Sequence, residues 1–285
     1  MNIENLFRQT YNKLKSLHLE QPHLEASWLI EKYAHVGALT RIKFPQKQID
    51  ESVMSHITKA LERRARGEPL AYIFNEKEFF GRKFFVNRHV LIPRPETELL
   101  VEWAIEWAHK NLYKQPINIL DLGAGSGCIG LTLLKELSFA RLTALDKSSE
   151  ALIVAKQNAK NLELENSCEF VHMDAALAAN LLKRYDLVVA NPPYISPDDI
   201  NIEENVKMYE PTEALFCGED GMQEMTAWLK AMPNVLTQRS AVCFEIGYNQ
   251  GARAINLFNN LNIFSRAYLL KDYAKHDRVI CGEIL

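Results

Sequence analysis

The tetrapeptide Asn191-Pro192-Pro193-Tyr194 follows a short apolar run and combines an amide, two prolines and an aromatic ring. Prolines cannot donate ladder hydrogen bonds, so a strand that reaches this point must end and turn out of its sheet. The Asn191 side-chain oxygen and the Pro192 backbone carbonyl can each accept one hydrogen, and Tyr194 can stack on a planar group. Such acceptors would hold an amide or aromatic amine nitrogen and stabilise the positive charge that develops as it attacks a carbon atom. The tetrapeptide therefore predicts a site for alkylation of a weakly nucleophilic nitrogen; a plain strand-terminating turn is the alternative.

A glycine-rich segment, Asp121-Leu122-Gly123-Ala124-Gly125-Ser126-Gly127, lies between an apolar run and a helical pattern that begins at Cys128. Glycines there allow the backbone to approach a ligand closely, and the helix N-terminus offers unpaired N–H groups. Asp146 ends the next apolar run about 20 residues later, where a carboxylate can hold both hydroxyls of a ribose. Together the two features predict a nucleoside-binding site.

The loop alone leaves two cofactors open, because the spacing of Gly125, Gly127 and Gly130 also matches the G-x-G-x-x-G pattern of dinucleotide enzymes. Asp121 favours S-adenosylmethionine, since a carboxylate suits a cationic cofactor and would repel a pyrophosphate. The nitrogen site predicted at Asn191 needs a carbon donor, which decides between the two in favour of a methyltransferase.

The elements before residue 93 should form a small domain and a connection. Apolar residues recur at helical spacing within residues 3–17, 24–33 and 49–61, and Gly67 is a natural stop for the third helix. Three amphipathic helices must cover one another, so residues 1–70 are predicted to be a separate helical bundle domain. The β-type residues of 71–74 and 79–86 predict a hairpin linker over residues 71–92.

Residues 93–285 are predicted to be the catalytic domain, of α/β class with a Rossmann-like, mostly parallel sheet. Two prolines delay its first helix to about Pro95, and that helix should run to about Asn111. Short apolar runs alternate with helical stretches thereafter. The predicted parallel strands are Ile117 to Leu122, Leu142 to Asp146, Glu169 to His172, Leu187 to Ala190 and Val242 to Ile246. The short link between Phe264 to Leu270 and Arg278 to Ile284 predicts an antiparallel pair at one edge.

Composition narrows the function further. Net charge is −3 overall, and the part after Gln115 holds 15 Lys and Arg against 22 Asp and Glu, which argues against stable nucleic-acid binding. The five cysteines form no C-x-x-C pair and the eight histidines show no metal-ligand spacing, so we expect reduced thiols and no metal. No run of about 18 apolar residues and no signal-peptide core is visible, so we expect a cytoplasmic protein without a membrane segment.

Several further segments resemble the release factor glutamine methyltransferase family (PrmC/HemK). They are Arg66 to Ile73, Phe79-Phe80-Gly81, Val90 to Glu98, Tyr209-Glu210-Pro211, Phe244 to Gly247 with Gln250, and Lys271-Asp272 with Asp277-Arg278. The likeness spans essentially the whole chain. Three departures are visible. Asn75 stands where the family usually has glycine, Ala175 stands where a larger residue is expected beside an adenine, and Gln238-Arg239-Ser240 replaces a glycine-containing turn.

The resemblance implies a class I S-adenosylmethionine-dependent methyltransferase that modifies the glutamine of the Gly-Gly-Gln motif in class 1 peptide chain release factors. The resemblance also implies that the enzyme releases S-adenosylhomocysteine and that the helical front domain holds the release factor. By matching motif, the implied cofactor residues are Gly123, Ala124, Gly125, Ser126, Gly127, Asp146, Ala175 and Asn191. The implied substrate residues are Asn191, Pro192, Pro193 and Tyr194, with Asn191, Pro192 and Tyr194 catalytic. A ribosomal-protein glutamine methyltransferase, a nucleic-acid amino-methyltransferase and a non-catalytic S-adenosylmethionine-binding adaptor remain alternatives.

Overall fold

The computed structural model describes residues 1–112, 115–200, 202–218 and 221–285. The chain divides into two compact units, Met1–Asn75 and Glu76–Leu285. Among the described residues, the first unit has one buried apolar cluster and the second has two, and each of these clusters lies within a single unit.

The first unit is helical, as the periodicity predicts. Its helices are α1 (Ile3–Lys15), α2 (Pro22–Ala34), α3 (Ala38–Lys43), α4 (Glu51–Ala65) and α5 (Leu70–Phe74). The apolar stripes of α1, α2 and α4 meet around fully buried Ile3, Leu29 and Ile57. The Asn2 side chain caps α1 by accepting from the Asn5 N–H. The three amphipathic helices are thus confirmed, whereas α3 and α5 are additional.

The prediction of a strand at residues 71–74 is wrong. These residues lie in α5, whose end is set by Asn75 in the left-handed region at φ 52°. Tyr72 and Ile73 are both buried in this helix, so packing outweighs the β preference of their side chains. Asparagine tolerates this conformation better than most residues, and the turn survives the departure from glycine.

The second unit begins with a short hairpin of β1 (Lys77–Phe79) and β2 (Arg82–Phe84). Its two turn residues, Phe80 and Gly81, both have positive φ, as a two-residue hairpin with right-handed strand twist requires. The single-turn helix η1 (Pro95–Thr97) follows and leads into α6 (Glu98–Asn111), at the bounds that the prolines predict.

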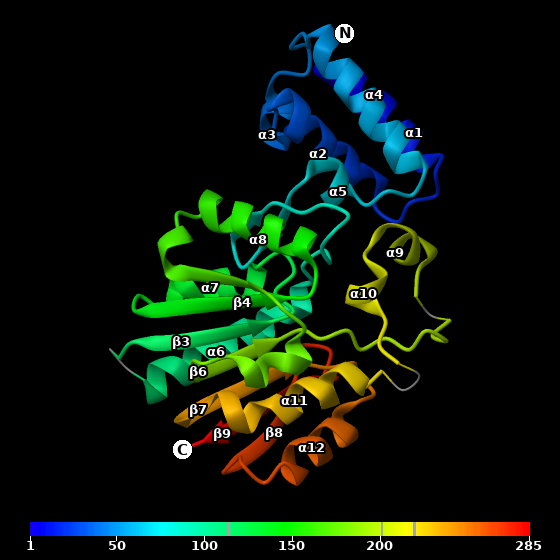
Figure 1. Ribbon diagram of the computed structural model, residues 1–285. Helices are drawn as coiled ribbons and strands as arrows, with labels where there is room; N and C mark the ends of the chain where they lie inside the picture. The colour runs from blue at the N-terminus through cyan, green and yellow to red at the C-terminus, as the bar shows by residue number, and fades with distance from the viewer. Residues whose placement is uncertain (113–114, 201, 219–220) are drawn as a thin grey trace. The chain divides into compact units, whose positions relative to one another are not determined.

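A seven-stranded sheet forms the centre of the described part of this unit (Figure 1). Its strands are β3 (Ile117–Leu122), β4 (Ala140–Asp146), β5 (Cys168–His172), β6 (Tyr185–Ala190), β7 (Leu236–Glu245), β8 (Arg266–Lys271) and β9 (Asp277–Ile284). The order is β5-β4-β3-β6-β7-β9-β8, and β9 runs antiparallel to both of its neighbours. All seven predicted strands are present, and the antiparallel pair lies at one edge, as expected. A reversed strand here departs from the all-parallel order of dinucleotide-binding sheets.

Helices cover both faces of the sheet (Figure 1). One face carries α6, α7 (Cys128–Glu136) and α8 (Ser149–Asn161); the other carries η3 (Ala175–Asn180), α11 (Gln223–Val235) and α12 (Gly251–Asn260). Successive residues of one strand point to opposite faces of the sheet: Ile119 packs in the first cluster and Leu120 in the second. The remaining short elements are η2 (Glu165–Ser167), α9 (Glu204–Tyr209) and α10 (Thr212–Leu215). Burial on both faces explains why these strands read as continuous apolar runs.

Candidate functional site

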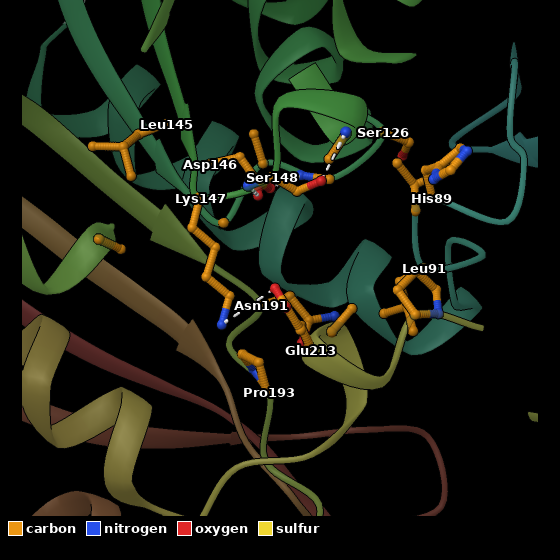
Figure 2. Close-up of a pocket in the computed structure, with 18 of the residues that line it drawn as sticks. His89, Leu91, Ser126, Leu145, Asp146, Lys147, Ser148, Asn191, Pro193 and Glu213 are labelled. Carbon is orange, nitrogen blue, oxygen red and sulfur yellow. Dashed lines mark hydrogen bonds and ion pairs between the residues drawn. The ribbon is translucent and has the colours of Figure 1, made fainter. Parts of the chain in front are cut away.

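A cavity of about 560 Å³ opens at the carboxyl ends of the central strands. β3 and β6 are neighbours there, and the chain order reverses between them, which is where open α/β sheets bind ligands. Figure 2 shows Asp146, Asn191 and Pro193 around this space. The topology therefore brings together residues that lie far apart in the sequence. The volume is in the range of small-molecule and cofactor sites.

The glycine-rich loop forms one wall of the cavity. Gly123, Ala124, Gly125 and Ser126 line it, while Gly127 is the first residue before α7 and does not. Gly125 has φ +54°, and a Cβ built on it would meet no protein atom closer than the Gly123 carbonyl oxygen at 3.9 Å. The glycine is therefore required by backbone conformation, and a side chain there would occupy space beside the cavity.

Asp146 fixes the loop to the end of β4. Its carboxylate accepts the Gly125 N–H and the Ser148 N–H, each at 2.8 Å. Burial raises the pKa of Asp146, while these two hydrogen bonds and the charge of Lys147 oppose the rise. Each carboxylate oxygen has a further lone pair, so the group can still accept from a ligand hydroxyl.

Asp121 lies fully buried beneath the same loop. One carboxylate oxygen accepts the Gly130 N–H at 3.0 Å, and the other has no hydrogen-bond partner among the described residues. Burial raises the pKa of Asp121 to about 7; the Gly130 hydrogen bond opposes the rise and the charge of Asp146 adds to it. An orphaned acceptor of this kind gains from a nearby cation.

These residues fit S-adenosylmethionine. The ribose hydroxyls of that molecule match the spare lone pairs of Asp146, which lines the cavity. Asp121 is buried and does not line the cavity, so its carboxylate favours a cationic ligand only through its charge. Ala175, at the start of η3, is buried and lines the cavity as a small apolar surface. Two carboxylates would instead repel a pyrophosphate, so the structure disfavours a dinucleotide at this loop.

The tetrapeptide after β6 is only partly at the cavity. Asn191 and Pro193 line it, whereas Pro192 and Tyr194 do not. Pro192 is buried, and the Tyr194 hydroxyl donates to the Glu245 carboxylate at 3.2 Å. Burial, followed by the charge of Glu245, raises the pKa of Tyr194, so this hydroxyl stays a donor.

Two segments that border the cavity are held together by Glu210, which lies in a family-like segment but is not among the predicted site residues. Glu210 is buried; one of its oxygens accepts from Arg94 at 2.6 Å and the other accepts the Ile92 N–H at 3.0 Å. Lys147 and Glu213 form a second, looser ion pair at 3.8 Å beside the same space (Figure 2).

Thr97 and Glu245 are further residues that the site prediction misses. Thr97 lines the cavity and accepts from the Asn191 amide at 3.3 Å, and its hydroxyl donates to Glu245 at 2.5 Å. Glu245 ends β7 and is fully buried. An acidic residue after four apolar strand positions is the signal that could have drawn attention to it.

Two kinds of feature are absent from the part of the chain that the structure describes. In residues 1–112, 115–200, 202–218 and 221–285, no helix is long and apolar enough to span a membrane. Within the same ranges, no group of three or more His, Cys, Asp or Glu side chains is placed to hold a metal ion.

Comparison with known proteins gives two family matches along the chain. Residues 5–74 match the PrmC N-terminal domain, and residues 103–213 match the methyltransferase small domain. The fold also resembles the solved catalytic domain of hMettl16, with a TM-score of 0.57, 13% identity, and coverage of 89% of this chain and 91% of that one. The second unit thus has the class I S-adenosylmethionine-dependent methyltransferase fold.

Two curated relatives show how far the likeness extends. The "Bifunctional methyltransferase" of Rickettsia prowazekii is 33% identical over 98% of this chain and 57% of its own length. The chain therefore spans little more than half of that relative. The "Release factor glutamine methyltransferase" of Nitratidesulfovibrio vulgaris is 35% identical over 98% of this chain and 94% of its own length. Because the match to the Nitratidesulfovibrio vulgaris protein covers nearly the full length of both that protein and this one, this chain belongs to the release factor glutamine methyltransferase family.

Proposed function

We propose that this protein transfers a methyl group from S-adenosylmethionine to the side-chain N5 of the glutamine in the Gly-Gly-Gln motif of class 1 peptide chain release factors, and so tunes translation termination. The names of the full-length relatives support a release factor as substrate. The observation that carries the proposal is the place of Asn191, whose amide lines the same cavity as Asp146 and the glycine loop.

The cofactor site in this proposal uses Gly123, Ala124, Gly125, Ser126, Gly127, Asp146, Ala175 and Asn191. When bound, S-adenosylmethionine supplies an electrophilic methyl group on a sulfonium. Asp146 holds hydroxyls with its spare lone pairs, and the negative charge of Asp121 beneath the loop favours a cation above it. The open space at Gly125 lets the backbone lie against the ligand.

The substrate site uses Asn191, Pro192, Pro193 and Tyr194. The Asn191 side-chain oxygen and the Pro192 backbone carbonyl each accept one hydrogen of the glutamine amide, which turns its nitrogen lone pair toward the donor carbon. Both acceptors also stabilise the positive charge that grows on the nitrogen. The N–C bond would form as the methyl–sulfur bond breaks. Because the amide hydrogen becomes acidic as this happens, it can leave late to water and no strong general base is needed. Tyr194 would have to leave Glu245 to stack on the substrate.

The division of labour follows the two units. We propose that the helical part, residues 1–70, recognises the body of the release factor and that residues 93–285 carry out the methyl transfer. Residues 71–92 connect these two parts. The five cysteines form no C-x-x-C pair and four of them are buried, which supports a reducing, cytoplasmic setting.

The test is incubation with labelled S-adenosylmethionine and three separate pools: a class 1 release factor, ribosomes and DNA. We expect label in the release factor, and none in the same factor when its Gly-Gly-Gln glutamine is replaced by alanine. Label in ribosomal protein or in DNA would support the sister enzymes instead. Cofactor binding without label in any pool would support a non-catalytic adaptor.

A further inference from the structure

Four side chains from three segments form one hydrogen-bonded chain behind the tetrapeptide. The Asn191 amide donates to the Thr97 hydroxyl oxygen at 3.3 Å, and Thr97 donates to one Glu245 oxygen at 2.5 Å. Tyr194 donates to the other Glu245 oxygen at 3.2 Å. Thr97 and Glu245 are 2% and 0% exposed, so water does not compete for these groups.

The direction of each hydrogen bond follows from the number of hydrogens that each group can donate. An ionised carboxylate can only accept, and a threonine hydroxyl has a single hydrogen. Thr97 gives that hydrogen to Glu245. Its oxygen can then only accept, so the Asn191 end that faces it must be the NH2 group.

This constraint decides which end of the Asn191 amide is left for a ligand. With the NH2 group held by Thr97, the carbonyl oxygen at the other end of the planar amide remains available at the cavity. If the Asn191 amide were rotated by about 180°, its NH2 group would face the cavity and would present hydrogen-bond donors instead. A carbonyl selects a substrate that carries N–H hydrogens, whereas donors would select a carboxylate such as glutamate.

Burial leaves the pKa of Glu245 raised overall, and three neighbouring groups oppose its protonation. Burial raises the pKa of Glu245, while the hydrogen bonds from Thr97 and Tyr194 and the charge of Arg278 lower it. The charge of Glu96 adds to the rise. Gln250 fixes the backbone nearby: its amide donates to the carbonyl oxygens of Tyr194 and Gly221, each at 3.0 Å.

We propose that Thr97 and Glu245 are positioning residues that hold the Asn191 amide with its carbonyl oxygen toward the cavity, and thereby set the preference for an amide nitrogen. This inference rests on the proposed function, because it assigns Asn191 the role of acceptor for the glutamine hydrogens. Thr97 acts through Asn191 and takes no part in the transfer itself.

The experiment compares Thr97→Val with Thr97→Ser in the full chain. Valine keeps the shape and removes the hydroxyl, so kcat should fall by about tenfold, the worth of one hydrogen bond. KM for the release factor and the dissociation constant for S-adenosylmethionine should stay within about twofold, because the hydrogen bond orients and does not bind. Serine restores the hydroxyl and should restore kcat.

Thr143→Val is the matched control. It removes another buried threonine hydroxyl of this unit, one that contacts the Tyr185 hydroxyl at 3.2 Å away from the cavity. Its kcat should equal that of the unmodified enzyme. An equal fall in kcat for both valine variants would mean that lost packing is the cause, and would overturn the inference.

A double-mutant cycle separates positioning from a structural role. If Thr97 acts through Asn191, Thr97→Val should lower kcat by less than about twofold when Asn191 is already alanine. A tenfold fall in both backgrounds would overturn the inference, as would a Thr97→Val variant with full turnover beside a slow Asn191→Ala variant. An Asn191→Ala variant with full turnover would instead refute the proposed clamp itself.

Discussion

At the scale of single residues, two buried carboxylates near the glycine-rich loop set the electrostatic preference of the site. Asp146 is held by two backbone N–H groups, whereas one oxygen of Asp121 has no partner in the described part of the chain. Unpaired negative charge is costly inside a protein. Burial raises the pKa of Asp121 to about 7, and a cationic ligand nearby would favour its ionised form.

Replacing Asp146 by alanine should weaken S-adenosylmethionine binding by about 1 to 3 kcal/mol, the worth of a charge-assisted hydrogen bond. Calorimetry on the purified protein measures this directly. Asp146→Asn is the companion variant, since it keeps one acceptor oxygen for the loop while it removes the charge. Unchanged affinity in both variants would exclude Asp146 from the binding site.

Asp121 should make stability depend on pH. Its pKa is about 7 in the folded protein, against an ordinary value of 3.8 for an aspartate in water, so the folded state binds more protons than the unfolded state between those values. Stability should therefore fall as pH rises from about 4 to 7, and the group destabilises the fold above 7 by something on the order of 4 kcal/mol.

The measurement for Asp121 is the melting temperature of Asp121→Asn relative to the unmodified protein at several pH values. Asparagine has no charge to bury, so its relative stability should be greater at pH 8 than at pH 5. A difference that does not change between those pH values would show that Asp121 does not titrate in this window.

At the scale of elements, the loop between β3 and α7 has to combine an unusual backbone with close approach to a ligand. Gly125→Ala should weaken S-adenosylmethionine binding, because the added Cβ takes space beside the cavity, and should also cost about 1 kcal/mol of stability from its positive φ. Binding by calorimetry and unfolding by denaturant measure the two effects.

Gly81→Ala is the matched control for the loop. Gly81 also has positive φ (+69°), and a Cβ on it would meet nothing within 4 Å in the β1–β2 turn. This variant should lose similar stability and keep its cofactor affinity. If both variants bind equally well, the space at Gly125 is not part of the site.

Elements were predictable where the physical signal is local. The strands of the sheet are short apolar runs buried on both faces, and the helix after Pro95 is delimited by its prolines. Residues 71–74 were misassigned because packing of Tyr72 and Ile73 outweighs their local preference. The site shows the same limit: the glycine loop, Asp146 and Asn191 have sequence signatures, whereas the Thr97–Glu245 contact joins residues 148 positions apart. Only the folded sheet creates that pair.

At the scale of the whole molecule, the separate cores of the two units predict separable tasks. A fragment of residues 76–285 keeps the entire sheet and all the cavity-lining residues. It should bind S-adenosylmethionine with unchanged affinity and methylate an intact release factor far more slowly than the full chain. Calorimetry and initial rates on the two proteins test this, with a short Gly-Gly-Gln peptide as the control substrate. Full efficiency of the fragment on the intact factor would refute the recognition role of residues 1–70.

The central claim is that acceptors at the end of β6 position a glutamine nitrogen for methyl transfer, and turnover of Asn191→Ala on a release factor tests it most directly. An acceptor that acts mainly as charge develops is worth about 2.7 to 4 kcal/mol, by analogy with a lost oxyanion-hole donor. Turnover should therefore fall by about a hundredfold to a thousandfold while S-adenosylmethionine affinity changes much less. Turnover close to that of the unmodified enzyme would contradict the claim.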